Sequence, residues 1–212
     1  MKKIIYTLSI VLGLGLSANA QIESLAGPRI GFVYISASPS STFLNGDIKL
    51  SDDYFPLQDE YDNIAKGTLT SLYGWQFESR FADGGNVTGI VEWIVLVAGM
   101  EKGKFLPSVS SMVGARTESG LEFALGPNLS MSGVAMVLGM GYNFKSGNLN
   151  IPVNIGFVPG RSATRRGRYE EHTTGPDGVW NTSDDIDISI EEDVDYHSGN
   201  RFSITVGFNL SK

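Results

Sequence analysis

Large apolar residues alternate with small or polar ones along most of this 212-residue chain, and this period of two restricts its fold most. In residues 201–209, apolar positions 202, 204, 206 and 208 alternate with Ser, Thr, Gly and Asn. The pattern recurs near 29–34, 73–78, 121–129, 136–144 and 149–157, and more weakly at 87–100 and 105–117. Such alternation is typical of strands with one apolar face. We therefore predict eight strands and no helix outside the N-terminal leader.

The face opposite the apolar one decides between two kinds of β protein. A soluble sandwich exposes that face to water and usually carries many Lys, Glu and Thr side chains there. Here it holds mainly Gly, Ala, Ser, Thr and Asn with isolated charges of both signs, which favours the crowded lumen of a narrow barrel. A sheet that spans lipid must close on itself to satisfy its backbone hydrogen bonds. A secreted β-sandwich or jelly roll remains the alternative.

The barrel interpretation assigns side chains to the lumen and to lipid. The predicted lumen charges are Arg29, Glu78, Arg80, Glu92, Arg116 and Glu122. The predicted membrane-facing aromatics are Phe32, Tyr73, Trp75, Phe77, Trp93, Phe123, Tyr142, Phe144, Phe157, Phe202 and Phe208.

The lengths of the connections support the same fold. Segments 82–86, 118–120 and 145–148 are short and fall on one side of the sheet, whereas 37–66 and 160–199 are long and fall on the other. Bacterial outer-membrane barrels have short periplasmic turns and longer extracellular loops. The sequence thus predicts an all-β, eight-stranded antiparallel transmembrane β-barrel with short periplasmic turns and two long extracellular loops.

The N-terminus has the features of an export signal. Lys2 and Lys3 precede an apolar stretch at 4–16, and Ala18-Asn19-Ala20 has the small-x-small pattern of a cleavage site. We predict a cleaved signal peptide over 1–20 and the barrel over 21–212. The chain has no cysteine, which excludes disulfides, thiolate zinc sites and a lipidated cysteine. A formal charge of −7 argues against nucleic acid as a partner.

From about 28 to 210 the chain resembles small outer-membrane barrels of the OmpA/OmpX-like kind. The resemblance rests on the alternation, the parity of the connections and the aromatic last strand at 202–210, which is similar to a C-terminal insertion signal. The chain departs from that signal by ending in Ser211-Lys212, and we expect no separate periplasmic domain. The resemblance implies a bacterial outer-membrane location and contact with outer-membrane lipid.

The second long loop has internal order of its own. Residues from Asp185 to Tyr196 alternate between acidic and apolar, and Arg165, Arg166 and Arg168 precede them. We expect strands seven and eight to continue beyond the membrane as a hairpin with cross-strand charge pairs. Oxygen-bearing residues at alternate positions in this loop suit calcium. The candidate calcium ligands are Asp177, Asn181, Ser183, Asp184, Asp185 and Asp187.

The sequence predicts little chemistry. Eight strands leave a barrel interior filled by side chains, so we expect a plug rather than a channel. The expected function is non-catalytic: a surface or envelope-integrity protein, or an accessory subunit that binds another outer-membrane or surface protein. One alternative is a narrow pore or transporter for ions or small apolar solutes. Another is an outer-leaflet lipid-modifying enzyme using His197 and Ser198, the chain's one adjacent His/Ser pair.

Overall fold

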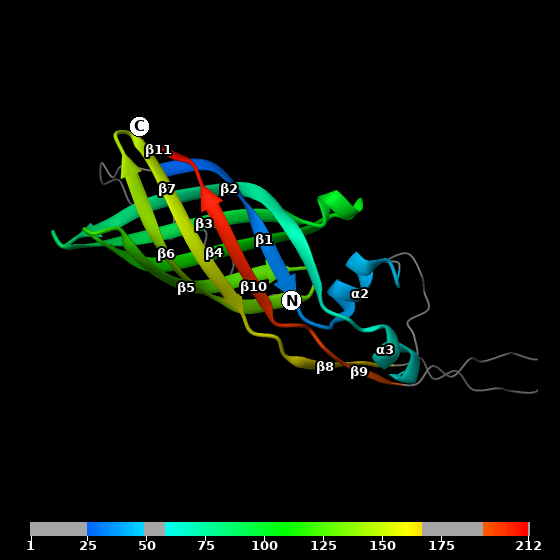
Figure 1. Ribbon diagram of the computed structural model, residues 1–212. Coiled ribbons are helices and arrows are strands. Elements are labelled where there is room, and N and C mark those ends of the chain that lie inside the picture. Colours follow the sequence, from blue (N-terminus) through cyan, green and yellow to red (C-terminus); the bar gives the residue numbers. More distant parts are fainter. Residues whose placement is uncertain (1–24, 49–57, 167–192, 212) are drawn as a thin grey trace, which may run out of the picture.

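The computed structural model describes residues 25–48, 58–166 and 193–211. The predicted signal peptide lies outside them. Most of the described chain is β-structure (Figure 1). The barrel strands are β1 (Leu25–Ile35), β2 (Thr68–Asp83), β3 (Val87–Ala98), β4 (Leu106–Thr117), β5 (Leu121–Ser130), β6 (Gly133–Ser146), β7 (Leu149–Val158), β10 (Arg201–Gly207) and β11 (Asn209–Ser211).

The strands close into a barrel. From β1 to β7, each strand pairs antiparallel with the next, and β10 and β11 lie between β7 and β1. β10 and β11 together form the eighth strand of the barrel. This strand is interrupted at Phe208, whose amide donates to the carbonyl of Pro28 at 3.0 Å. The prediction of an eight-stranded, antiparallel, closed barrel is confirmed.

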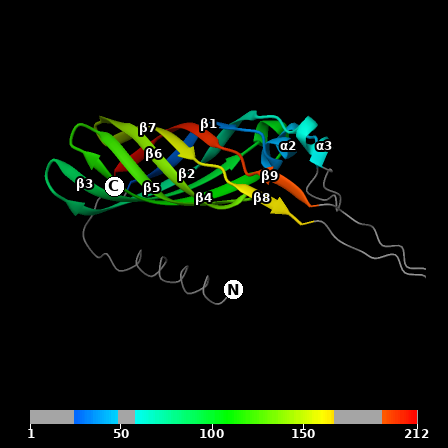
Figure 2. The ribbon, with the colours of Figure 1, turned by 90° about the horizontal axis from the view of Figure 1, so that it is seen from below.

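The two ends of the barrel differ (Figures 1 and 2). At one end, called here the short-turn end, tight turns at 84–86, 118–120 and 147–148 join the strands. The left-handed backbone of Gly120 (φ 99°) and Gly147 (φ 60°) makes two of these turns possible, because other residues rarely adopt it. The opposite end, the loop end, carries the connections 36–67, 99–105, 131–132 and 159–200.

The expectation of no helices is wrong for the first long connection. It contains α2 (Pro39–Asn45) and α3 (Gln58–Ile64), and the short connection after β3 contains η1 (Met100–Lys102). Ser38 caps α2 through a capping box, Pro39 occupies its first turn and Gly46 ends it. Seven residues are too few to show a helical stripe in the sequence. None of the helices in the described ranges is long and apolar enough to cross a membrane.

A second small sheet extends the barrel wall at the loop end. β8 (Ser162–Arg165) pairs antiparallel with β9 (Val194–His197), as the predicted hairpin requires. The side chain of Gln58 in α3 holds β9 by hydrogen bonds to the backbone oxygen (3.1 Å) and nitrogen (2.9 Å) of Asp195. The cross-strand contact seen here joins Thr164 Oγ1 to Asp195 Oδ1 at 2.6 Å. The other residues of the predicted charge pairing lie mainly beyond the described ranges.

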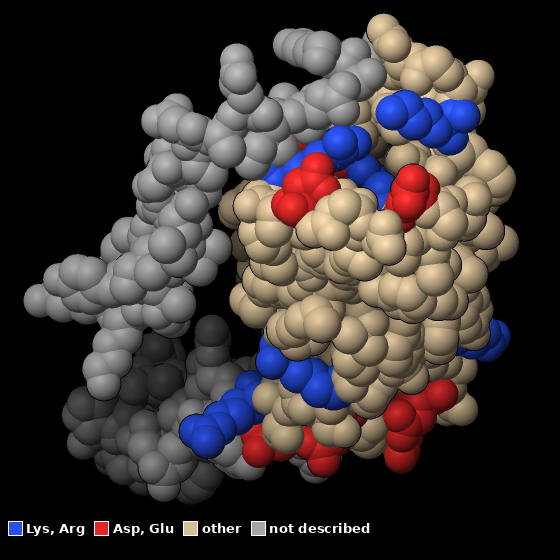
Figure 3. Space-filling view, turned by 90° about the vertical axis from the view of Figure 1, so that its left-hand side faces the viewer, with Lys and Arg blue, Asp and Glu red and all other residues tan. Residues whose placement is uncertain are grey.

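The outer surface of the barrel is apolar. Nine of the predicted membrane-facing aromatics are exposed, whereas Trp93 and Phe157 are half-buried. Phe157 stacks on Phe202 with ring centroids 4.7 Å apart. In Figure 3, a broad area without charged side chains separates charged groups near the upper and lower edges of the view.

Candidate functional site: the barrel interior

Arg116 on β4 is the centre of an ion-paired cluster in the short-turn half of the interior. Its two terminal nitrogens donate to the carboxylate of Glu78 on β2 at 2.7 and 2.5 Å. Its Nε donates to Glu122 on β5 at 2.5 Å. All three side chains are buried. The two-pronged contact with Glu78 is the fork geometry in which arginine and carboxylate bind most strongly.

A second chain of contacts crosses the same level of the barrel. Arg29 on β1 donates to Gln76 on β2, and Gln76 donates in turn to Glu92 on β3. Arg29 also donates to Thr205 Oγ1 at 3.3 Å, and Asn209 donates to Gln76 Oε1 at 3.3 Å. Gln76 therefore links a buried cation to a buried anion, with its oxygen facing the first and its nitrogen the second.

Together these groups fill the cross-section of the barrel. Asn154 on β7 donates to Glu122 at 3.4 Å, so seven of the eight strands contribute a side chain. The remaining strand, β6, places Gly141 there, where an added Cβ would lie 2.7 Å from Cγ of Asn154. We call this set the polar plug; all its members but the half-buried Asn154 are buried, and it consists of Arg29, Gln76, Glu78, Glu92, Arg116, Glu122, Asn154, Thr205 and Asn209.

Five of the six lumen charges predicted from the sequence belong to the polar plug. The sixth, Arg80, is half-buried and lies on the same inward-facing row of β2, two residues closer to the short-turn end than Glu78. Three positive and three negative formal charges thus occupy the interior at this end. Buried charges are tolerated when they are paired and hydrogen-bonded, as most of these are.

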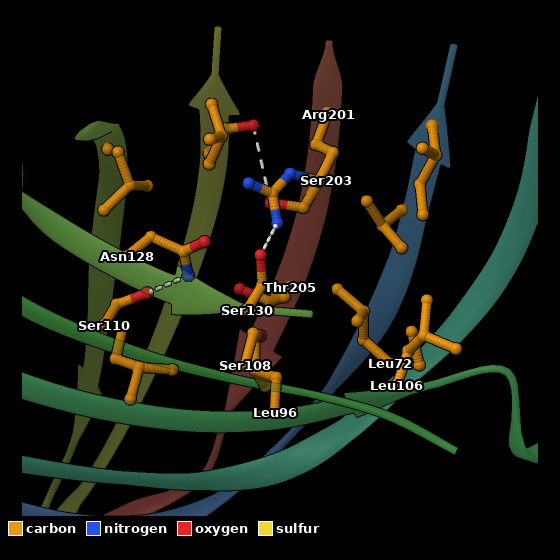
Figure 4. A pocket seen from close by; sticks show the side chains of 18 of the residues that line it. Leu72, Leu96, Leu106, Ser108, Ser110, Asn128, Ser130, Arg201, Ser203 and Thr205 are labelled. Carbon is orange, nitrogen blue, oxygen red and sulfur yellow. Dashed lines mark hydrogen bonds between the residues drawn. The ribbon is translucent and has the colours of Figure 1, made fainter. Parts of the chain in front are cut away.

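The loop-end half of the interior has a different filling. Apolar side chains pack there, and α2 covers them by inserting Leu44 among Val33, Ile35, Leu72 and Ala98. Between this packing and the polar plug lies a cavity of about 120 Å³. Its lining includes Leu72, Leu96 and Leu106 but also the hydroxyl groups of Ser108, Ser110, Ser130 and Ser203 (Figure 4).

Besides Arg29 of the polar plug, a second cation, Arg201, lines this cavity. Arg201, the first residue of β10, donates from a terminal nitrogen to Ser130 Oγ at 2.8 Å (Figure 4). Its Nε is buried and has no hydrogen-bond partner. No carboxylate of the described residues lies within ion-pair distance of Arg201. Arg201 differs in this from Arg116, which has two carboxylate partners in the same barrel.

The rim of the loop end contains one strongly bound carboxylate. Glu101 in η1 accepts hydrogen bonds from Thr70 Oγ1 at 2.5 Å, from the amide of Ser71 at 3.1 Å and from the hydroxyl of Ser71. Partial burial alone would raise the pKa of the Glu101 carboxyl, but the hydrogen bonds from Ser71 and Thr70 outweigh it and hold the pKa at about 2. Lys102 Nζ also donates to Thr68 Oγ1 at 2.5 Å, so two neighbouring residues of η1 hold it to β2.

The two residues of the candidate enzymatic pair bond to other groups among the described residues. His197 accepts a hydrogen bond at Nδ1 from the amide of Gly199 at 3.1 Å, and Ser198 Oγ accepts one from the amide of Arg161 at 3.0 Å. A serine nucleophile is activated by a base within hydrogen-bond reach of its hydroxyl, and no hydrogen bond joins Ser198 to His197 in the described part of the chain.

The candidate calcium ligands lie outside the described residues. Within the described ranges, no group of three or more His, Asp or Glu side chains is placed to hold a metal ion.

Sequence reasoning missed two residues of the interior that the structure brings forward. Gln76 and Arg201 both lie on inward-facing rows. The alternation along β2 and β10 could have placed both side chains inside the barrel. Gln76 carries no charge, and Arg201 stands at the edge of its strand, so neither stood out among the isolated lumen charges.

Comparison of the chain with models of protein families, with characterised proteins and with solved structures gives no match.

Proposed function

We propose that this protein is a bacterial outer-membrane β-barrel that neither conducts nor catalyses and acts as a surface or envelope-integrity protein. The observation that carries the proposal is the polar plug, with Arg116 held between Glu78 and Glu122 across the lumen. An eight-stranded barrel has an interior just wide enough for side chains to fill. Charges paired across the lumen support a barrel that is plugged and does not conduct ions.

The outer surface supports a lipid environment. Large apolar side chains are exposed on every one of the eight strands, among them Phe32, Trp75, Phe123 and Phe202. Contiguous apolar surface of this kind is rare on soluble monomers. A closed barrel also leaves no unpaired strand edge, which lipid would not tolerate. In this orientation the short-turn end faces the periplasm and the loop end faces outward.

The loop end is the part available to a protein partner. α2, α3, η1 and the β8–β9 sheet all lie at this end (Figures 1 and 2). The contacts of Gln58 with Asp195 and of Ser40 Oγ with Ser132 Oγ (2.8 Å) join connections that are far apart in the sequence. Loops fastened to a rigid scaffold are common binding surfaces. We propose that this surface contacts another outer-membrane or surface protein.

Two measurements test the proposal. The folded protein from the membrane fraction should migrate differently on a gel before and after boiling, as a closed barrel resistant to detergent does. In planar bilayers the wild type should give no steady conductance, whereas the double variant Glu78→Ala with Arg116→Ala should conduct. Arg166→Ala, which changes an exposed loop arginine, is the matched control and should stay silent. Wild-type conductance equal to that of the double variant would refute a plugged barrel, and a soluble protein unaffected by boiling would refute a membrane barrel.

A further inference from the structure

The cavity in the loop-end half of the barrel is amphipathic. β1, β2 and β3 line it with apolar side chains, among them Val33, Leu72 and Leu96, whereas β5 and β10 contribute Asn128, Ser130, Ser203 and Thr205. The polar plug forms its floor, because Arg29 and Asn154 belong to both. An interior that served packing alone would be filled to the density of other protein cores. This one keeps a space between an apolar wall and hydrogen-bonding groups.

Arg201 gives the cavity a preferred charge. Its guanidinium has five N–H donors, and Ser130 accepts from one terminal nitrogen while the Nε has no partner. A half-buried cation without a carboxylate is costly, since neither water nor an opposite charge fully compensates it. An anion placed in the cavity would supply the missing partner. A planar carboxylate fits best, because guanidinium binds it through two parallel hydrogen bonds.

The cavity also has an entrance at the loop end. A second pocket of about 240 Å³ lies under α2 and shares Ser40, Leu106, Met131 and Ser132 with the cavity. Its other lining residues include Pro39 and Phe43 of α2. The hydrogen bond between Ser40 and Ser132 bridges this entrance. A solute that passes beneath α2 would reach a cavity that Arg201, Leu72 and Leu96 line together.

We propose that the loop-end cavity binds a small monocarboxylate, whose carboxylate pairs with Arg201 while its apolar part lies against Leu72 and Leu96. The size follows from the volume: an apolar cavity of about 150 Å³ accepts benzene with its six carbons, so about 120 Å³ accommodates an apolar group of roughly five carbons, such as the tail of hexanoate. The proposal adds a ligand to the proposed plugged barrel and rests on it, since the plug forms the floor of the site.

The test measures binding of carbon-13-labelled hexanoate by NMR to the chain in lipid nanodiscs at pH 7, with empty nanodiscs as the blank. Wild type should bind hexanoate saturably. Acetate lacks the tail and 1-hexanol lacks the charge, so each should bind at least about tenfold more weakly. The proposal would be overturned if the folded wild type did not bind hexanoate saturably. It would also be overturned if 1-hexanol bound as tightly as hexanoate.

Two pairs of variants locate the site. Arg201→Gln should weaken hexanoate at least about tenfold and leave 1-hexanol unchanged, whereas Arg161→Gln, an exposed arginine at the same end, should change neither. Ser108→Phe should fill the cavity and abolish binding, whereas Val109→Phe, on the opposite face of β4, should not. Equal affinity in Arg201→Gln and wild type would overturn the proposal.

Folding and function are separated by the gel and conductance measurements. Each variant is first checked for the boiling-dependent shift in migration. If Arg201→Gln does not fold, two comparisons still test the binding site. These are Ser108→Phe against Val109→Phe, and hexanoate against 1-hexanol in the wild type. A folded, silent barrel that binds no hexanoate would refute the ligand and leave the proposed plugged barrel standing. A conducting wild type would refute the plugged barrel itself.

Discussion

The two halves of the barrel interior are built from the same eight strands but handle buried polar groups in opposite ways. In the short-turn half, Arg116 is neutralised by Glu78 and Glu122, and Gln76 links Arg29 to Glu92. In the loop-end half, Arg201 has one hydroxyl partner and borders a cavity. A buried charge is held most firmly where its partners are fixed on neighbouring strands. The comparison indicates that the first half provides rigidity, whereas the second keeps space and charge available.

The largest effect is expected from breaking the ion pairs of the polar plug. Arg116→Ala leaves Glu78 and Glu122 buried without their cation, which should lower the free energy of unfolding by about 3–5 kcal/mol. Urea unfolding of the barrel in lipid, followed by the boiling-dependent gel shift, measures the change. Arg166→Ala is the exposed control and should shift it by less than about 0.5 kcal/mol. A loss in Arg116→Ala no larger than in the control would mean that the plug is not the rigid half.

The neutral groups of the two halves offer a sharper comparison of intermediate size. Gln76→Ala removes a fully buried partner of Arg29 and of Glu92, and should cost about 3 kcal/mol. Asn128→Ala removes one hydrogen bond of 2.9 Å to Ser110 beside the cavity and should cost about 1 kcal/mol. The same urea titration compares them. Equal losses would show that the halves are equally well packed.

The barrel was predictable from the sequence because its signals are local. The two-residue period determines which residues of a strand face inward. The lengths of the connections determine which end of the barrel carries the short turns and which the long loops. Isolated charges on a small-residue face, such as Glu92 and Arg116, then have to lie inside. The cavity was not predictable in this way. Which inward residues meet across the lumen depends on strand tilt and stagger, and alternation alone does not determine them.

The smallest effect is expected at the rim, where Glu101 fastens η1 to β2. The pKa of Glu101 is about 2 in the folded protein, below its ordinary value of 4.5, so the folded state favours the ionised carboxylate. Its stabilisation is therefore complete above about pH 5 and is lost as the pH falls towards 2. Glu101→Gln should cost on the order of 0.5–1 kcal/mol at pH 7, since the group is largely exposed, and almost nothing near pH 2.

Urea unfolding of wild type and Glu101→Gln at pH 7, 4 and 2.5 measures this dependence. The difference between the two proteins should shrink steadily over that series, because protonation of Glu101 makes the wild-type side chain neutral, as the glutamine of the variant is throughout. Asp83→Asn, at the short-turn end, is the matched control, since its carboxylate only accepts from the amide of Gly85 at 3.0 Å in an exposed turn. A difference that stayed constant with pH would mean that the shape of Glu101, and not its charge, holds η1 on the rim. A difference as large as that of Gln76→Ala would place the rim, and not the plug, among the rigid parts of the barrel.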